Sequence, residues 1–475
     1  MISGYRRNLA LAAAGGIAIL SSIALAPAQA DSHRIGKEVT ALDEYIQKPD
    51  DSYGYKVLVE KKGAGFTYFV LELTSQTWRS EKDVGRPVWT HQLNMIVPTV
   101  LKSDASLLAI SGGANGREPR DSPREEYAQF AALTGSVVTE LQQVPNQPLT
   151  YTGEKEGKVE DASIAYTWDK FLRTGDKEWP LQLPMTKSAV RTMDAITDFC
   201  ASEQGGNNKV GRFVVAGGSK RGWTTWLTAA VDTRVIAIAP IVIDMLNVVP
   251  SFRHHYQAYG FFAPAVDDYV EMGIMDWMGT DEYTALAKMV EPYEYRQRLT
   301  MPKYIVNASG DQFFVPDSHQ FYYDELVGEK YIRYVPNADH GLNGSNAWEG
   351  LIAWYQAILD ATPRPKFKWN IAEDGSIHVE TGDKPLEVNL WQASNADARD
   401  FRVDTIGKTW QASDLAPVSD GKYAAKVSAP GKGFAAFFIE LKFPGSPGLP
   451  MIFSTGVKVT PDSLPFDEYK RKPVK

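Results

Sequence analysis

The stretch VGRFVVAGGSKRGWTTWLTAA, residues 210–230, decides the fold. It passes from a β-rich apolar run through two glycines to Ser219, and then into residues that favour a helix. This order of strand, sharp turn, serine and helix is typical of a nucleophile elbow, which lifts a serine hydroxyl above the carboxyl edge of a sheet. The match to G-x-S-x-G is imperfect, because Arg221 stands where the last glycine belongs and Gly222 follows one position later. A serine that only caps the helix is the alternative that this stretch leaves open.

Two later apolar runs end in the residue types that a catalytic serine needs. YIVNASGD ends at Asp311, and IRYVPNADH ends at His340. In α/β-hydrolases the acid and the histidine follow the serine in this order, each after a later strand. We therefore expect the three side chains at one sheet edge, with His340 as general base and Asp311 orienting its imidazole. Asp244, which ends RVIAIAPIVID, is a competing acid; we favour Asp311 because its strand directly precedes the histidine strand.

Other polar residues near these positions have simpler interpretations. Asp317 and His319 share the Asp311 loop and are read either as solvated loop residues or as pocket walls. His254 and His255 are adjacent, and adjacent residues do not share a helix face, so two-point metal chelation is not expected. The sequence predicts no metal and no cofactor.

The first residues of the predicted helix also bear on catalysis. The peptide N–H of Lys220 lies at a helix start and is suited to stabilising an oxyanion. A second donor is expected after an early strand, and the glycine-rich run at 111–116 offers the N–H groups of Gly113 and Ala114. A plain turn explains this run equally well. Asn115, in the same run, is a candidate substrate-binding residue.

Lys220 and Arg221 place two positive charges at a helix start, where they oppose the helix dipole. A carboxylate is therefore expected to face one of them, either in the protein or on the substrate. Arg221 is accordingly a candidate substrate-binding residue, with an internal salt bridge as the alternative.

Apolar strands and helical segments alternate from about Ala41 to Asp360, which indicates an α/β fold with a mostly parallel sheet covered by helices on both faces. The earliest part of this region alternates with period two and predicts antiparallel strands on one edge. We expect an α/β-hydrolase domain over residues 31–363. Residues 247–300 interrupt the strands with an aromatic, acidic, helical stretch and predict an inserted cap.

Aromatic side chains of this cap are candidates for contact with substrate. Tyr256 and Phe261 are the two that we single out, and an ordinary cap core is the alternative. Residues 364–475 contain short strands, frequent turn residues and no helical period, which predicts a small β-sandwich. We expect this sandwich to brace the hydrolase domain, and glycan binding is the alternative.

Residues 1–30 resemble a signal peptide, with Arg6 and Arg7, an apolar stretch and an A-x-A pattern at its end. A membrane anchor is the alternative, and the paired arginines raise a twin-arginine export route as a minority interpretation. No other stretch is long and apolar enough to span a bilayer. We therefore expect a periplasmic or secreted protein. The formal net charge of −8 argues against nucleic acid as a partner.

The segments SKRGW at 219–223 and DQFF at 311–314 resemble the PhoPQ-activated pathogenicity-related protein family, and the resemblance extends from about Ala41 to Phe466. It implies an α/β-hydrolase fold, a Ser219, Asp311 and His340 set, and a link to virulence-related regulation, but no defined substrate. We expect an exported serine hydrolase that acts on an acyl ester or a peptide bond of a small molecule. The rival hypothesis is a secreted binding or signalling protein that keeps a hydrolase scaffold.

Overall fold

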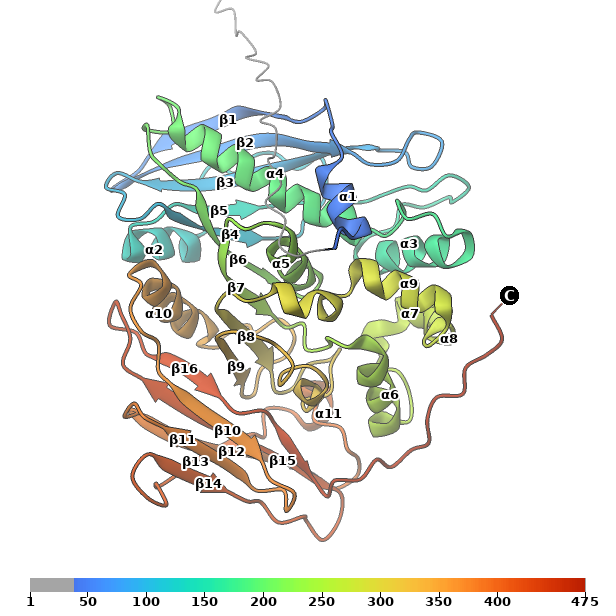
Figure 1. The fold of residues 1–475 in the computed structure, drawn as a ribbon, viewed down its shortest axis with the longest axis vertical. Helices are drawn as coiled ribbons and strands as arrows, with labels where there is room; N and C mark the ends of the chain where they lie inside the picture. The colour runs from blue at the N-terminus through green and yellow to red at the C-terminus, as the bar shows by residue number, and fades with distance from the viewer. Residues whose placement is uncertain (1–37, 475) are drawn as a thin grey trace, which may run out of the picture.

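A computed structural model describes residues 38–474, so the predicted signal peptide lies outside the described residues. A sheet of 14 strands runs through the molecule in the order β1-β2-β3-β5-β4-β6-β7-β8-β9-β16-β15-β12-β13, with β17 paired to β15 (Figure 1). Its strands are β1 (Gly54–Lys62), β2 (Phe66–Thr77), β3 (Val88–Pro98), β4 (Ala105–Ile110), β5 (Val138–Leu141), β6 (Arg212–Gly218), β7 (Val235–Ile241), β8 (Lys303–Ala308), β9 (Lys330–Val335), β12 (Glu387–Asn395), β13 (Gln411–Asp414), β15 (Phe434–Phe443), β16 (Met451–Ser454) and β17 (Lys458–Thr460).

The antiparallel edge predicted from the period-two pattern is confirmed. Strand β2 pairs with β1 and β3 in antiparallel register, and β3 is also antiparallel to β5. From β5 to β9 the strands are parallel, so their carboxyl ends meet at one edge of the sheet. Ser219, Asp311 and His340 follow β6, β8 and β9, and that common edge therefore receives all three.

Helices cover both faces of this sheet. The helices that precede the cap are α1 (Ala41–Gln47), α2 (Glu125–Thr134), α3 (Glu160–Thr174), α4 (Gln182–Ala201) and α5 (Lys220–Val231), and α10 (Ala347–Leu359) follows the last parallel strand. Alternate residues of β6 enter different cores: Phe213 and Val215 pack with residues of α3, α4 and α5, whereas Val214 and Ala216 pack with residues of α2 and α10. A strand that is buried on both faces has a continuous run of apolar residues. For this reason FVVA, residues 213–216, shows no alternation of apolar and polar side chains.

The predicted cap region is helical and lies between β7 and β8. It contains α6 (Val248–Tyr259), α7 (Asp267–Glu271), α8 (Ile274–Trp277), α9 (Asp281–Val290) and two 3₁₀ turns, η1 (Pro264–Val266) and η2 (Pro292–Arg298). In Figure 1 these elements gather on the side where the carboxyl ends of the parallel strands lie. The insertion therefore covers the edge that carries the three predicted site residues.

The C-terminal strands form two layers, but one layer is continuous with the hydrolase sheet. A three-stranded sheet contains β10 (Phe367–Ile371), β11 (Ile377–Thr381) and β14 (Lys422–Ala425). Its inner residues, such as Val379, pack in one core with Phe437 and Ile439 of β15. The other layer joins the large sheet where Ser454 of β16 pairs with Ile332 of β9. The boundary at 363 stays a prediction, and this strand pairing is not predicted from the sequence.

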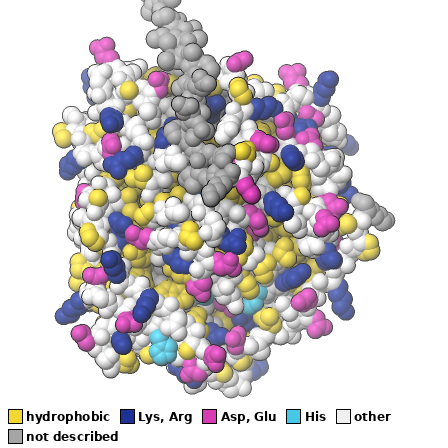
Figure 2. All heavy atoms as spheres, in the orientation of Figure 1, with side chains coloured by type: hydrophobic (Ala, Val, Ile, Leu, Met, Phe, Trp, Pro, Cys, Tyr) yellow, Lys and Arg dark blue, Asp and Glu magenta, His cyan; other side chains and the backbone are white. Residues whose placement is uncertain are grey.

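Charged side chains of both signs are mixed over the face shown in Figure 2, with apolar side chains between them and no large patch of one sign. Between residues 38 and 474, no helix has the length and hydropathy needed to cross a membrane. The same part of the chain holds no group of three or more His, Cys, Asp or Glu side chains arranged to bind a metal ion.

Candidate active site

Ser219 occupies the turn between β6 and α5 with φ 57° and ψ −128°, a conformation that non-glycine residues rarely adopt. Its N–H donates to the carbonyl of Ile241 at 2.8 Å, which extends the ladder between β6 and β7 into the turn. Its own carbonyl accepts the N–H of Trp223 at 3.0 Å, the first hydrogen bond of the helix. A residue held in strained backbone by bonds on both sides is typical of a functional position.

The spacing of the glycines follows from how closely helix and strand approach. A Cβ on Gly217 would lie 2.6 Å from the carbonyl oxygen of Arg221. A Cβ on Gly222 would lie 2.9 Å from the carbonyl oxygen of Gly217 and 3.1 Å from that of Ile241. Both positions therefore exclude a side chain. Gly222 supplies this close contact, although it stands one place later than the usual motif has it.

The two cations after Ser219 face carboxylates of the protein. Lys220 Nζ lies 2.9 Å from Glu160 Oε2 and 2.9 Å from Asp161 Oδ2. Arg221 Nη2 lies 2.7 Å from Glu160 Oε1, and Arg221 Nε donates to the carbonyl of Val144 at 2.6 Å. Burial alone would raise the pKa of Glu160, but the two cations outweigh it and lower this pKa to about 2. These contacts give Arg221 internal partners, so its substrate-binding role stays a prediction without support.

Asp311 and His340 are in contact. His340 Nδ1 lies 2.8 Å from Asp311 Oδ2 and 3.0 Å from Oδ1. The N–H of Phe313 donates to Asp311 Oδ1 at 2.8 Å, and the N–H of His340 donates to Gln312 Oε1 at 2.9 Å. Two contacts therefore join the loop of Asp311 to the loop of His340, one to the imidazole and one to the backbone N–H of His340. In the sequence, DQFF is recognised only as a family signature. The role of Gln312 as a link to the histidine loop is not predicted from it.

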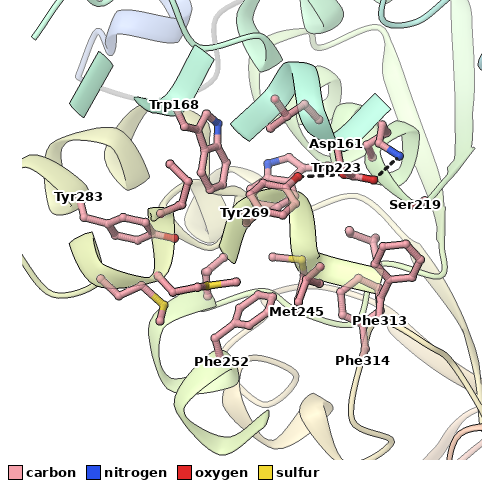
Figure 3. A pocket seen from close by; sticks show the side chains of 18 residues that line it. Asp161, Trp168, Ser219, Trp223, Met245, Phe252, Tyr269, Tyr283, Phe313 and Phe314 are labelled. Atoms are coloured by element: carbon pink, nitrogen blue, oxygen red, sulfur yellow. Dashed lines mark hydrogen bonds and ion pairs between the residues drawn. The ribbon is translucent and has the colours of Figure 1, made fainter. Parts of the chain in front are cut away.

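The rest of that signature covers the imidazole. The ring of Phe313 lies 4.3 Å from the ring of His340, centroid to centroid, and Phe314 lies 6.0 Å from it. Both phenylalanines line the same pocket as Ser219, and in Figure 3 they lie beside it. His340 Nε2 is buried and makes no hydrogen bond with any residue from 38 to 474, the Ser219 hydroxyl included.

Asp244, the competing acid, has other partners. The hydroxyls of Tyr322 and Tyr334 donate to its two carboxylate oxygens at 2.6 and 2.7 Å. Its complete burial raises the pKa of Asp244 to about 7, against the effect of the two tyrosines. The structure thus brings Asp311, and not Asp244, into contact with His340.

Asp317 is a buried structural acid. Arg399, from the segment after β12, places Nη2 2.6 Å from Asp317 Oδ2, and His254 Nε2 of the cap lies 3.0 Å from Oδ1.

Neither Asp317 nor His319 lines the pocket at Ser219. His319 instead packs against Trp369 and against Gly456, where a Cβ would meet its ring. These contacts join the cap, the acid loop and the C-terminal strands.

The pocket beside Ser219 is narrow and mostly apolar, with a volume of about 40 Å³. Its walls come from α3, the start of α5, the segment after β7 and the cap helices (Figure 3). Its polar groups include Asp161, which accepts a hydrogen bond from the hydroxyl of Tyr269 at 2.9 Å.

Phe252 of the cap lines this pocket, whereas Tyr256 and Phe261 do not. Tyr256 packs on Tyr469, and Phe261 stacks on Tyr259, so both belong to the cap surface.

The glycine-rich run at 111–116 begins beside the serine turn, because Ile110 of β4 pairs with Gly217 of β6. Gly113 has φ 130°, which favours glycine. The N–H of Asn115 is already bonded to the carbonyl of Gln147 at 2.7 Å. The run lies where α/β-hydrolases place the second oxyanion donor. The assignment of Gly113, Ala114 and Lys220 to an oxyanion hole stays a prediction.

A mixed sheet with this strand order, a strained serine between strand and helix, and an acid–histidine contact after later strands define the α/β-hydrolase class. The comparisons with known proteins lead to a particular family within it. The chain belongs to the PhoPQ-activated pathogenicity-related protein family, whose model matches residues 42–402.

One relative matches nearly the whole chain. It is autocrine proliferation repressor protein A of Dictyostelium discoideum, which is 37% identical over 456 residues, covering 90% of this chain and 92% of that protein. Among solved structures, acetyl xylan esterase 1 of Thermoanaerobacterium sp. has a TM-score of 0.46 and 14% identity, covering 67% of this chain and 93% of its own. Acetyl xylan esterase of Paenibacillus sp. R4 has a TM-score of 0.47 and 14% identity, covering 68% and 92%.

Proposed function

We propose that this protein is a serine hydrolase that cleaves an acyl ester or a peptide bond, with Ser219 as nucleophile, His340 as general base and Asp311 as the orienting acid. The observation that carries the proposal is the 2.8 Å contact between Asp311 and His340 Nδ1, at the sheet edge where Ser219 is held in strained backbone. Strained backbone is typical of a functional serine, and His340 Nε2 has no partner among residues 38–474, which leaves it available as a base.

The proposed proton transfer runs from the Ser219 hydroxyl to His340 Nε2. With Nδ1–H bonded to Asp311, the lone pair of His340 lies on Nε2, which is the atom that must accept the Ser219 proton. The Ser219 hydroxyl must turn toward Nε2 when substrate binds, and such hydrogen bonds often form only in the substrate complex. Oγ then attacks the carbonyl carbon, the imidazolium protonates the leaving group, and water attacks the acyl-enzyme with His340 again as base.

The negative charge on the substrate oxygen would be stabilised at the start of α5. The N–H of Lys220 is one proposed donor, and Gly113 or Ala114 supplies the other. The side chain of Lys220 is nine-tenths buried and held by Glu160 and Asp161, so its positive charge stays next to Ser219. Because two carboxylates pair with this ammonium, the peptide N–H groups, and not the side-chain charge, are the proposed source of oxyanion stabilisation.

We also propose that the protein is exported, because the residues before 31 resemble a signal peptide. We further propose a link to virulence or to the envelope-stress response from the family resemblance alone; the description of the family names pathogenicity.

A second candidate function is binding or signalling without catalysis. It is favoured by one observation: the 37% identical relative is named for repression of proliferation, not for an enzymatic activity. Such a protein would keep the fold and the contacts of the site but would not form an acyl-enzyme.

A fluorophosphonate probe separates the two candidates, because it modifies only an activated serine. We expect the purified protein to be labelled, the label to be absent in Ser219→Ala, and the label to be retained in Ser413→Ala, which changes an exposed serine on β13. A folded wild-type protein that takes no label would overturn the hydrolase proposal and favour the binding protein. Protein that has not been exposed to the probe is then tested on matched acyl esters and aminoacyl peptides to decide between esterase and peptidase.

A further inference from the structure

Another cavity lies against the glycine-rich run. It has a volume of about 270 Å³, and its walls include Gly112–Ala114, the run that holds the predicted oxyanion donors. The wall also includes three arginines, namely Arg117, Arg120 and Arg124. This arginine cleft shares no lining residue with the apolar pocket at Ser219.

The arginines of this cleft are only partly neutralised. Arg124 Nε lies 3.5 Å from Glu140 Oε1, and Glu140 is 1% exposed beneath the cleft. Arg117 and Arg120 have no ion-pair partner among residues 38–474. The nearby acid Asp121 pairs with Lys61 at 2.9 Å and does not line the cleft. A concave wall with more positive than negative charge concentrates anions, although the protein as a whole is acidic.

The cleft is built onto the same framework as the nucleophile. Gly112 lies against Arg221, since a Cβ there would sit 2.3 Å from the guanidinium of this neighbour of the serine turn. The carbonyl of Gly112 accepts the N–H of Gln143 at 3.1 Å. Gln92 Nε2 donates to the carbonyl of Arg117 at 2.7 Å, which fixes the start of the arginine segment. A ligand in this cleft would therefore touch the wall that borders the reacting carbonyl.

We propose that the arginine cleft binds a carboxylate of the substrate, so that the hydrolase acts on anionic esters or peptides. The inference rests on the proposed function and adds the substrate class to it. An uncharged part of the substrate occupies the apolar pocket, and the carboxylate lies in the cleft. Arginine suits this role because its planar guanidinium presents paired N–H donors that match the two oxygens of a carboxylate.

Matched ester pairs test the proposal. In one pair, 4-acetoxybenzoate and its methyl ester, the carboxylate is on the leaving group; in the other, 4-nitrophenyl hydrogen succinate and its methyl ester, it is on the acyl group. For each pair the ratio of kcat/KM, anionic over neutral, is compared between variants, so that intrinsic reactivity cancels. We expect the ratio of at least one pair to fall about 10-fold in Arg117→Gln/Arg120→Gln. Added salt should lower the ratio of the wild type in the same direction.

Two further variants separate charge loss from misfolding. Arg120→Lys keeps the charge but not the paired donors, and should retain more of the preference than Arg120→Gln. Lys384→Gln removes an exposed positive charge near the C-terminal strands and should leave both ratios unchanged. All variants are checked for an unaltered Tm and for fluorophosphonate labelling.

The outcomes distinguish the two proposals. If the wild type hydrolyses the neutral esters through Ser219 but the arginine variants change neither ratio, the carboxylate site is wrong and the hydrolase proposal stands. If the wild type takes no probe and cleaves no ester, the hydrolase proposal fails, and with it the substrate class inferred here.

Discussion

Ser219 and His340 lie at the same sheet edge, but they are held in different ways. The serine turn depends on β6, the adjacent strand β7 and helix α5, through the close approach of Gly217 and Gly222. The acid and histidine loops depend on a segment much later in the chain. The N–H of Val403 donates to the carbonyl of Gly310 at 3.0 Å, next to Asp311. Asn337, three residues before His340, exchanges two 2.9 Å hydrogen bonds with the backbone of Trp410.

This comparison gives the C-terminal strands a role in the site. The segment between β12 and β13, which includes the short helix α11 (Val403–Ile406), packs on both loops that carry Asp311 and His340. Arg399 of the same segment reaches the buried Asp317 of the acid loop. The C-terminal strands are expected from the sequence to brace the hydrolase domain. In the structure, the segment between β12 and β13 contacts the proposed catalytic loops, in addition to the pairing of β16 with the sheet edge.

The largest effect is expected from the acid that contacts the histidine. Asp311→Asn should lower kcat by about 10⁴-fold, because the amide holds the wrong tautomer of His340. Asp244→Asn, at the end of the neighbouring strand, should lower kcat by less than about 10-fold, since Asp244 contacts tyrosines and not the imidazole. Steady-state hydrolysis of a neutral ester measures both. Equal losses in the two variants would contradict the assignment of the acid.

The next effect concerns the C-terminal contact with the acid loop. Arg399→Met removes the main partner of a buried carboxylate and should lower the free energy of unfolding by about 3–5 kcal/mol. The double variant Asp317→Asn/Arg399→Met removes the unpaired charge and should recover part of this loss. Urea unfolding followed by tryptophan fluorescence gives the values. A single variant as stable as the wild type would show that the histidine side does not depend on this pair.

On the serine side, Gly222→Ala should lower the free energy of unfolding by about 1–3 kcal/mol. Two of the three atoms that the new methyl group meets within about 3 Å belong to the backbone of β6 and β7, and they cannot move aside easily. Gly211→Ala is the matched control, because a Cβ there meets nothing within 4 Å. If both alanine variants are equally stable, the close approach of helix and strand does not fix the serine turn.

The two sides also differ in what the sequence could predict. Ser219, Asp311 and His340 were each identified because a polar residue follows an apolar strand, and such a signal is local. Glu160 and Arg399 carry no such signal, because each is recognised only through a partner brought near by folding. The joining of β16 to β9 was missed for the same reason: the pairing of distant strands leaves no mark in the periodicity of either. The DQFF signature was informative, since its four residues bind, link or cover the imidazole.

The smallest effect is expected at Glu160, the acid shared by Lys220 and Arg221. Its pKa lies at about 2 in the folded protein, below the ordinary value of 4.5, so its contribution is complete above pH 4.5 and is lost as the pH falls toward 2. Glu160→Gln should lower the free energy of unfolding by about 1 kcal/mol at pH 7, a small amount because this side chain is 38% exposed. The difference from wild type should shrink when urea unfolding is repeated at pH 4 and pH 3. Glu203→Gln, which changes an exposed glutamate without an ion-pair partner among residues 38–474, serves as control. A difference that stays constant with pH would mean that Glu160 holds the serine side by packing and not by its charge.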